Sequence, residues 1–352
     1  MDGIRALSIA AVMFYHSFGT FGARIGVSAF FVLSGFLVTW LLIKEYSDYD
    51  SISLKGFYYR RTLRIFPAYF GFLFLVFFVE TLQDFEKIKE FIVPSVFYYY
   101  NYYYPVTDHG HPALGHLWSL CVEEQFYILW PFLFMLFARR EYRSVFILLV
   151  SIVLVCLMWR LYGYYELNLG PKWLYRAFDS RFDNLAIGCF FAIVVANKRY
   201  GALLWRLVSQ AKYFSVYFVI LIASRMLGMY AEAYSYTFGF TVEAILIGLL
   251  MIQCIVFYEQ KYFKWLNSRL LLFIGTISYP MYLYHELASG ISDAIGGRLA
   301  SRFGLAIGPY LTGIASFSLT IVMAFFSYKF IEIPFLRLKS LRRKRDAIIE
   351  TV

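Results

Sequence analysis

The sequence VFILLVSIVLVCLMW, residues 145–159, contains no charged side chain. Similar runs, nearly or wholly uncharged, recur at 66–78, 185–196, 214–222, 244–257 and 311–326. With their flanks, most of these runs approach the roughly 20 residues that cross a bilayer core as a helix. Because a chain in hydrocarbon must satisfy its own backbone hydrogen bonds, we expect helices there. A transmembrane barrel would need alternating ten-residue segments, which the sequence does not show.

The composition of the whole chain agrees with this interpretation. Of 352 residues, 61% are hydrophobic and 16% are charged, and the mean hydropathy is +0.61. Soluble domains are about 45–50% apolar and about 25% charged. We therefore expect an all-α, polytopic integral-membrane helical bundle, with residues 1–335 forming one membrane domain. About ten transmembrane helices are predicted, at 4–21, 26–43, 65–82, 117–137, 144–163, 183–197, 213–229, 238–257, 270–288 and 305–328.

The net charge is +10, and the distribution of this charge predicts the orientation of the chain. The loops and the tail on one side of the expected spans carry 21 Lys and Arg residues, against nine on the other side. The positive-inside rule then places both termini in the cytoplasm, and the even number of spans agrees with this placement. We expect the basic cytoplasmic tail, 336–352, to bind anionic lipid and not nucleic acid.

The cysteines and the start of the chain bear on two further questions. All four cysteines are isolated inside expected spans, without a Cys-x-x-Cys pair, at Cys121, Cys156, Cys189 and Cys254. This pattern indicates neither a zinc site nor a disulfide framework, so no metal is expected. No separate cleavable signal peptide is visible, and the first span is expected to serve as the insertion signal.

Ionisable side chains inside spans are costly in lipid, which makes them candidates for function. Arg5 and His16 lie eleven positions apart in the first span. At 100° per residue they share one face of the helix, about 16 Å apart along its axis. This layout suits an anionic donor arriving from the cytosol and a base set deeper in the membrane. Alternatively, Arg5 extends to the lipid headgroups and His16 bonds to a neighbouring helix.

A basic segment, KGFYYRRTLRIFP at 55–67, precedes the third span. If this loop is helical, Arg60 and Arg64 share a face, with Arg61 beside them. Guanidinium clusters bind phosphates through paired hydrogen bonds. The alternative is a basic patch on anionic lipid. Pro67 is expected to mark the start of the third span.

The string GHLWSLCVEEQFY, residues 115–127, opens the fourth span from the non-cytoplasmic side. Glu123 and Glu124 point in directions 100° apart, so we expect at most one of them to face a shared polar cavity. One carboxylate could orient or charge-balance the imidazole of His16. Alternatively, the two acids complement the positive end of the helix macrodipole.

The ninth span contains SYPMYLYHE, residues 278–286. Ser278 and Tyr282 are one helical turn apart, and Pro280 is expected to kink the helix. His285 and Glu286 are expected to end it on the outer side. His285 is either an interfacial residue or a second functional histidine.

Two other signals are weak. His109, His111 and His116 lie close together in the sequence but lack a supporting acid at metal-ligand spacing. The tyrosine-rich run 98–104 could stack on sugar rings, yet it is more typical of an interfacial aromatic belt.

Taken together, these motifs resemble acyltransferase family 3, which includes O-antigen, peptidoglycan and nodulation-factor O-acetyltransferases. The resemblance runs from Met1 to about Phe335, and its strength comes from the order of the motifs. The matching positions are Arg5 and His16; the segment 26–37; Arg60, Arg61, Arg64, Ile65, Pro67 and Tyr69; Trp118–Leu120 and Val122–Tyr127; Ser278–Pro280, Tyr282, Leu283 and His285; and Glu332 with Pro334.

The resemblance implies a multi-pass enzyme of the bacterial inner membrane. It would transfer an acyl group, most often acetyl, from cytosolic acyl-CoA to a hydroxyl of a cell-surface or exported carbohydrate, such as a lipid-linked saccharide. No cofactor would be bound permanently, and the CoA thiolate leaves readily enough without a metal. The implied roles are donor binding by Arg5, Arg60, Arg61 and Arg64, catalysis by His16 with Glu123 orienting it, and substrate binding by Trp118, Ser119, Tyr282 and His285.

Two alternatives remain open at this stage. The acceptor could be a small hydrophobic product such as a macrolide, or the protein could be a lipid-linked saccharide transporter without covalent chemistry. A transporter would be expected to show paired repeats with interrupted spans, which are not apparent. Ser28 stands where the family commonly has an aspartate. The chain ends without the hydrolase-like domain of some relatives, so a stand-alone enzyme is expected.

Overall fold

The computed structural model describes residues 1–19, 22–138, 142–303 and 308–338, and the regular structure within these ranges is helical, without a β-strand. This confirms the all-α prediction. From residue 339 onward, the predicted basic tail lies outside the described residues.

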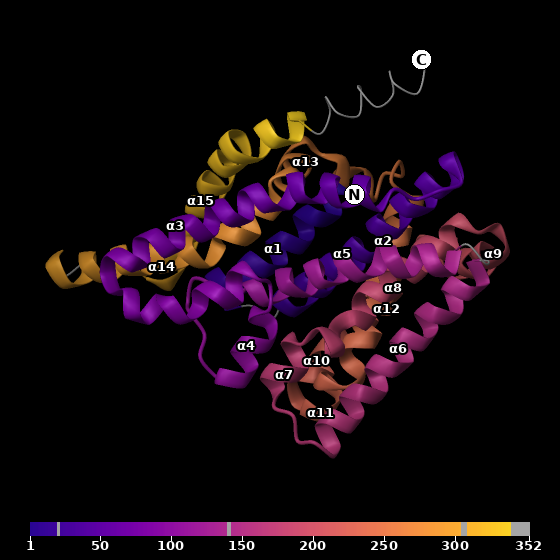
Figure 1. Cartoon of the computed structure of the whole chain (residues 1–352), viewed down its shortest axis with the longest axis horizontal. Helices are drawn as coiled ribbons and strands as arrows, with labels where there is room; N and C mark the ends of the chain where they lie inside the picture. Colours follow the sequence, from indigo (N-terminus) through magenta and orange to yellow (C-terminus); the bar gives the residue numbers. More distant parts are fainter. Residues whose placement is uncertain (20–21, 139–141, 304–307, 339–352) are drawn as a thin grey trace.

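The helices follow one another with short connections (Figure 1). They are α1 (Asp2–Phe18), α2 (Ala23–Tyr49), α3 (Leu54–Val96), α4 (Tyr100–Thr107), α5 (Leu117–Ala138), α6 (Tyr142–Tyr165), α7 (Pro171–Arg176), α8 (Phe178–Ala196), α9 (Lys198–Val208), α10 (Lys212–Tyr230), α11 (Glu232–Tyr236), α12 (Phe238–Val256), the 3₁₀ turn η1 (Lys264–Asn267), α13 (Arg269–Thr276), α14 (Ser278–Phe303), α15 (Pro309–Ser327) and the π-helical turn η2 (Tyr328–Glu332).

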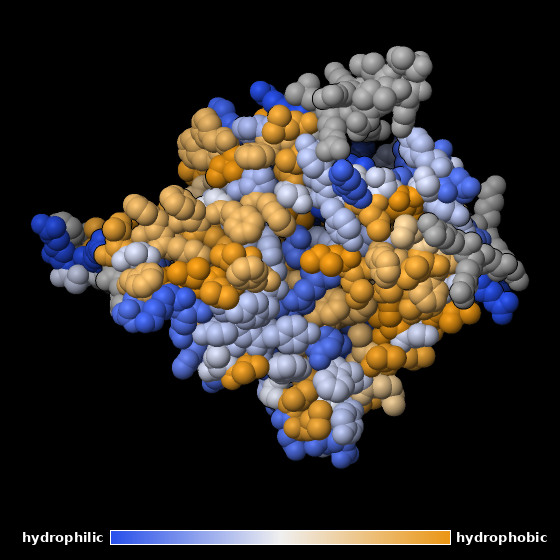
Figure 2. Space-filling model, viewed as in Figure 1, coloured by the Kyte–Doolittle hydropathy of each residue, from blue (hydrophilic) through white to orange (hydrophobic). Residues whose placement is uncertain are grey.

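Among the described residues, seven helices are long and apolar enough to cross a membrane. They are Ala23–Tyr49, Leu54–Leu82, Leu117–Ala138, Tyr142–Tyr165, Lys212–Tyr230, Phe238–Val256 and Pro309–Leu338. Figure 2 shows broad hydrophobic areas on one face of the molecule, as expected of a surface that contacts lipid. The polytopic helical class is therefore confirmed.

The other three expected spans coincide with helices that are shorter or more polar. The first expected span is α1, which has 17 residues. The sixth is α8, which carries Asp179, Arg181 and Asp183 in its first two turns. The ninth is divided at Ile277 between α13 and α14. The number of spans and the side of the termini stay predictions.

The arginine-rich segment is helical and not a loop. Only residues 50–53 separate α2 from α3, and α3 continues without interruption for 43 residues. Pro67 lies well inside this helix, so the prediction that it marks a helix start was wrong. The N-cap Ser53, whose side chain accepts a hydrogen bond from the Gly56 amide, defines the start instead. As a result, Arg60, Arg61 and Arg64 are held on a rigid helix.

The late motif also differs from the expectation. Pro280 lies in the first turn of α14, where a proline does not interrupt a helical hydrogen bond. The helical structure is interrupted just before it, at Ile277, between α13 and α14. His285 and Glu286 do not end a helix, because α14 continues to Phe303. Both side chains therefore sit on a helix that is ordered on either side of them. In Figure 1, α14 and α3 run side by side along one edge of the molecule.

The centre of the bundle is a close contact between α2 and α8. A Cβ on Gly35 would lie 2.0 Å from the Leu185 carbonyl oxygen, and one on Gly188 would lie 2.1 Å from that of Val32. Only glycine allows the two backbones to approach so closely.

Buried ion pairs connect this centre to neighbouring helices. Arg24 pairs with Glu243 at 2.9 Å, and Arg160 pairs with Asp183 at 2.8 Å. The same oxygen of Asp183 also accepts a hydrogen bond of 2.6 Å from the Thr241 hydroxyl. Both guanidinium groups make several hydrogen bonds within the bundle, and we assign the two ion pairs to the framework.

Candidate active site

A cavity of about 1050 Å³ opens between α1, α2, the start of α3, α5 and α14. All four arginines expected to bind a donor line it: Arg5, Arg60, Arg61 and Arg64. Arg5 comes from α1, whereas the other three come from the first three turns of α3. The structure thus brings these four arginines together around one cavity.

The arginines already have neighbours in this structure. Arg60 forms an ion pair with Glu45 at 2.6 Å, and Arg5 forms one with Asp2 at 2.6 Å. The Arg61 guanidinium lies over the Tyr127 ring, 4.4 Å from its centroid. Because exposed ion pairs contribute little free energy, Arg60 can exchange Glu45 for an anionic ligand at small cost.

Glu123 and Glu124 both line the cavity. The expectation that at most one of them would face a shared cavity was therefore wrong. Glu123 Oε1 accepts a hydrogen bond of 2.7 Å from the Ser34 hydroxyl, which in turn accepts one of 3.0 Å from Tyr127. This chain of hydrogen bonds fixes the Glu123 carboxylate in the wall of the cavity, which it shares with the arginines and whose lining does not include His16.

At its inner end the cavity is bounded by Ser119 and Tyr282, whose hydroxyl oxygens are 2.6 Å apart. Tyr282 also lies 3.4 Å from the backbone oxygen of His116. Trp118 is not among the described lining residues; its ring packs against Phe31 and Tyr175. Of the four residues expected to bind substrate, two therefore lie at the cavity end.

A cluster of imidazoles lies on the far side of the Tyr282 ring. The His16 and His285 ring centroids are 4.7 Å apart, and those of His116 and His285 are 4.9 Å apart. Tyr282 contacts both His285 and His116, at 5.3 and 5.5 Å between ring centroids. We call His16, His116, His285 and Glu286 the histidine cluster.

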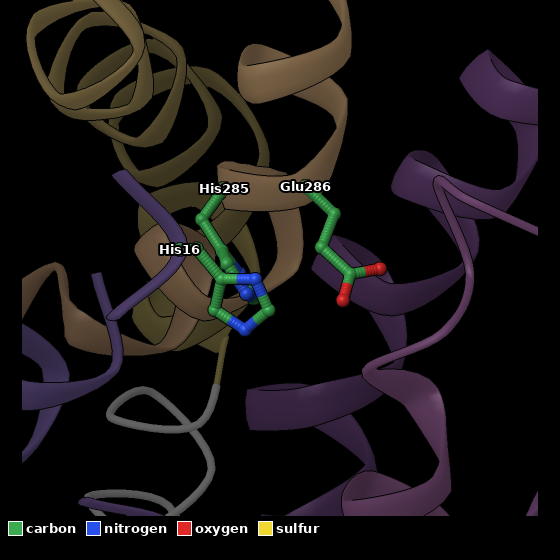
Figure 3. Close-up of side chains that lie close together, drawn as sticks. All are labelled: His16, His285 and Glu286. Carbon is green, nitrogen blue, oxygen red and sulfur yellow. The ribbon is translucent and has the colours of Figure 1, made fainter. Parts of the chain in front are cut away.

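Figure 3 shows His16, His285 and Glu286 with their side chains near one another. One ligating atom from each of these three residues lies within 4.8 Å of the others. His16 comes from the end of α1 and is exposed, whereas His285 comes from the second turn of α14 and is buried. The structure therefore places Glu286, and not Glu123, beside His16.

Hydrogen bonds fix the orientation of the two buried imidazoles. His285 Nδ1 lies 2.7 Å from the Tyr282 carbonyl oxygen, and His116 Nδ1 lies 3.1 Å from Glu286 Oε2. Since a carbonyl or a carboxylate only accepts, each Nδ1 carries a proton, and in the neutral imidazole Nε2 is then the atom with the lone pair. Both Nε2 atoms are buried without a hydrogen-bond partner among the described residues.

The three histidines of the 109–116 segment have separate environments. His111 pairs with Glu80, at 3.6 Å between Nε2 and Oε2, and its burial lowers the pKa of its imidazole. His109 is exposed. Only His116 joins the histidine cluster, a role that its sequence spacing had not indicated.

The sequence-based prediction thus missed His116 and Glu286. The only available signal was Glu286 directly following His285 in a polar stretch of a late span. His116 and Glu286 are hydrogen-bonded to each other but lie 170 residues apart in the chain, so no local sequence pattern could have predicted the pair.

Comparisons with known proteins agree with the sequence motifs. Residues 1–329 match the family model described as an acyltransferase domain, Acyl_transf_3. The chain is 31% identical, over 95% of its length, to the "Putative O-acetyltransferase" of Staphylococcus aureus (strain COL), of which it covers 56%. It is 28% identical, also over 95% of its length, to the peptidoglycan O-acetyltransferase OatA of Listeria monocytogenes, of which it covers 55%.

The chain therefore spans about half the length of the curated relatives it matches. No solved structure gives a significant match. Because the family model covers nearly the whole chain, this protein belongs to acyltransferase family 3.

Proposed function

We propose that this protein is a membrane-embedded O-acyltransferase. It would transfer an acyl group, most often acetyl, from cytosolic acyl-CoA to a hydroxyl of a cell-surface or exported carbohydrate in a bacterial inner membrane. The carrying observation is that α1 connects an arginine-lined cavity, at Arg5, to an imidazole, at His16. The names of the relatives, which include a peptidoglycan O-acetyltransferase, support a carbohydrate acceptor.

The donor would bind in the cavity. Its volume of about 1050 Å³ slightly exceeds the usual range for ligand pockets, about 300–1,000 Å³, and suits a large donor. Arg60, Arg61 and Arg64 would bind the phosphates of acyl-CoA through charge-assisted hydrogen bonds. The thioester would then extend along α1, past Arg5, toward the hydroxyls of Ser119 and Tyr282.

The chemistry would take place at His16. Its imidazole would accept the proton of the acceptor hydroxyl while the acceptor oxygen forms a bond to the acyl carbon. The carbon–sulfur bond breaks, and CoA leaves as a thiolate. A negative charge beside His16 would favour the imidazolium that forms, and Glu286 supplies it.

Ser119 and Tyr282 separate the donor cavity from the histidine cluster. For the acyl carbon to reach His16, their hydrogen bond would have to open. The released hydroxyls would then be able to donate to the acyl carbonyl oxygen, where negative charge develops. Because the groups that separate the two regions are the hydroxyls of Ser119 and Tyr282, the donor itself could form hydrogen bonds with them once their mutual hydrogen bond opens.

The direct test is acyl transfer by purified, reconstituted protein carrying His16→Ala. Loss of a general base is expected to lower kcat about 10²–10⁴-fold, with the KM for acyl-CoA little changed. The matched control is His109→Ala, an exposed histidine outside the cluster, which should retain wild-type transfer. Full activity of His16→Ala at normal expression would overturn the assignment.

A further inference from the structure

The histidine cluster contains lone pairs that acyl transfer does not require. One base is sufficient to deprotonate a hydroxyl, yet three imidazoles and a carboxylate meet here. The side chains of His116 and His285 are at most 4% exposed, and both present an Nε2 without a partner among the described residues. A buried polar atom without a partner costs about 1–3 kcal/mol in general, so such a pattern points to a missing ligand.

The side-chain atoms that meet here match the ligands that transition metals bind. His16 and His285 offer imidazole nitrogens and Glu286 a carboxylate oxygen, with one atom from each within 4.8 Å of the other two. Two histidines with one glutamate form a common protein ligand set for zinc sites that keep an open position. Mg²⁺ and Ca²⁺ prefer oxygen ligands, so the nitrogen donors favour an ion of the zinc class.

The surroundings of these ligands also resemble those of metal sites. Metal-binding histidines usually donate their second ring N–H to a carbonyl or a carboxylate, and ligating carboxylates are hydrogen-bonded in turn. His285 donates Nδ1–H to the Tyr282 carbonyl. Glu286 accepts from His116 Nδ1 and from the His116 amide, at 3.1 and 3.3 Å. These bonds orient two of the three ligands before any ion arrives.

We infer that His16, His285 and Glu286 form a site for a divalent transition-metal ion such as Zn²⁺, with His116 and the Tyr282 carbonyl orienting the ligands. The His16 side chain is exposed, at the end of α1 opposite to Arg5 and the donor cavity. A His16 nitrogen bound to a metal has no lone pair left to accept a proton. Bound Zn²⁺ therefore blocks acyl transfer, and this second statement rests on the proposed function.

Binding is tested on the purified full-length chain in detergent, by isothermal titration with ZnCl₂ and by metal content after gel filtration. We expect one Zn²⁺ per chain and no comparable binding of MgCl₂. His285→Gln and Glu286→Gln should each weaken Zn²⁺ binding by at least about 10-fold, on the scale seen for altered metal sites. The control is His109→Gln, at an exposed histidine outside the cluster, which should bind Zn²⁺ as the wild type does.

Cobalt gives an independent readout that does not depend on activity. Co²⁺ bound by two imidazoles and a carboxylate should produce a visible absorption band that Zn²⁺ abolishes. Thermal unfolding of each variant identifies those that fail to fold, and the milder His116→Gln, which removes only an orienting group, should still reduce affinity. Equal Zn²⁺ binding by wild type, His285→Gln and Glu286→Gln, or no binding by the wild type, would overturn the site.

The blocking effect is measured separately, in acyl transfer with EDTA and then with added Zn²⁺. Inhibition that EDTA reverses, at the Zn²⁺ concentrations that saturate the titration, supports the inference. Zn²⁺ binding without inhibition would overturn the blocking role and leave the site. Absence of transfer by the EDTA-treated enzyme would instead count against the proposed function, while the binding result would stand.

Discussion

The two ends of α1 face environments that differ in kind. Around Arg5 the cavity is large, lined by arginines and carboxylates whose ion pairs can exchange partners. Around His16 the groups are few, and two of the imidazoles are buried and oriented by hydrogen bonds. The first region suits a large, charged, flexible donor, whereas the second suits a single chemical step. Under the proposed function, the difference teaches that charge would recruit the donor, while fixed orientation would be required only where bonds change.

The comparison predicts that the two carboxylate positions have different roles. Glu286→Gln should lower kcat by about 10²-fold, because the imidazolium at His16 would lose its nearby charge. Glu123→Gln should leave kcat closer to the wild type and alter the KM for acyl-CoA, since Glu123 faces the arginines. Steady-state transfer kinetics on both variants decide this. The reverse pattern would restore Glu123 as the partner of His16.

The partition between the two regions can be altered next. Tyr282→Phe removes one hydroxyl and keeps the ring that contacts His116 and His285. If this hydroxyl donates to the acyl carbonyl, kcat should fall about 10-fold, equivalent to one hydrogen bond. Ser119→Ala, measured alone and combined with Tyr282→Phe, gives the coupling between the two hydroxyls. Unchanged kcat in both variants would show that the pair only closes the cavity.

The donor end should respond in KM and not in kcat. Arg60→Ala removes a guanidinium that we propose binds a phosphate of the donor, and it should raise the KM for acyl-CoA about 10-fold, the scale of a charge-assisted hydrogen bond. The exposed Arg298, on α14, provides a matched Arg→Ala control outside the cavity lining. A fall in kcat with unchanged KM would place Arg60 in the chemical step instead.

The smallest expected effect comes from the partner of Arg60. Glu45→Gln removes the carboxylate that pairs with this guanidinium and would compete with the proposed donor for it. Because exposed ion pairs are worth about 0.2–1 kcal/mol, the KM should fall by no more than about 5-fold, and less at high salt. Kinetics at two ionic strengths test the electrostatic origin. A rise in KM would mean that Glu45 holds Arg60 in its binding position.

Local sequence patterns predicted individual helices better than they predicted the site. The uncharged run 145–159 forms part of α6 as expected, because apolar runs in lipid have no alternative to a helix. Helix limits were less predictable: α3 begins at Leu54 and includes the arginine-rich segment, because Ser53 caps the helix ahead of it. At the site, the arginines lie around one cavity as expected, but His16 lies beside Glu286 and not beside Glu123.

The sequence by itself determined that this is a helical membrane protein with the ordered motifs of acyltransferase family 3, because hydropathy and motif order are properties of the chain read in one dimension. Only the tertiary structure decided which acid lies beside His16 and which histidine accompanies His285. Those contacts depend on how α1, α14 and the start of α5 pack, and such packing follows from shape complementarity between distant segments. No local sequence pattern records it.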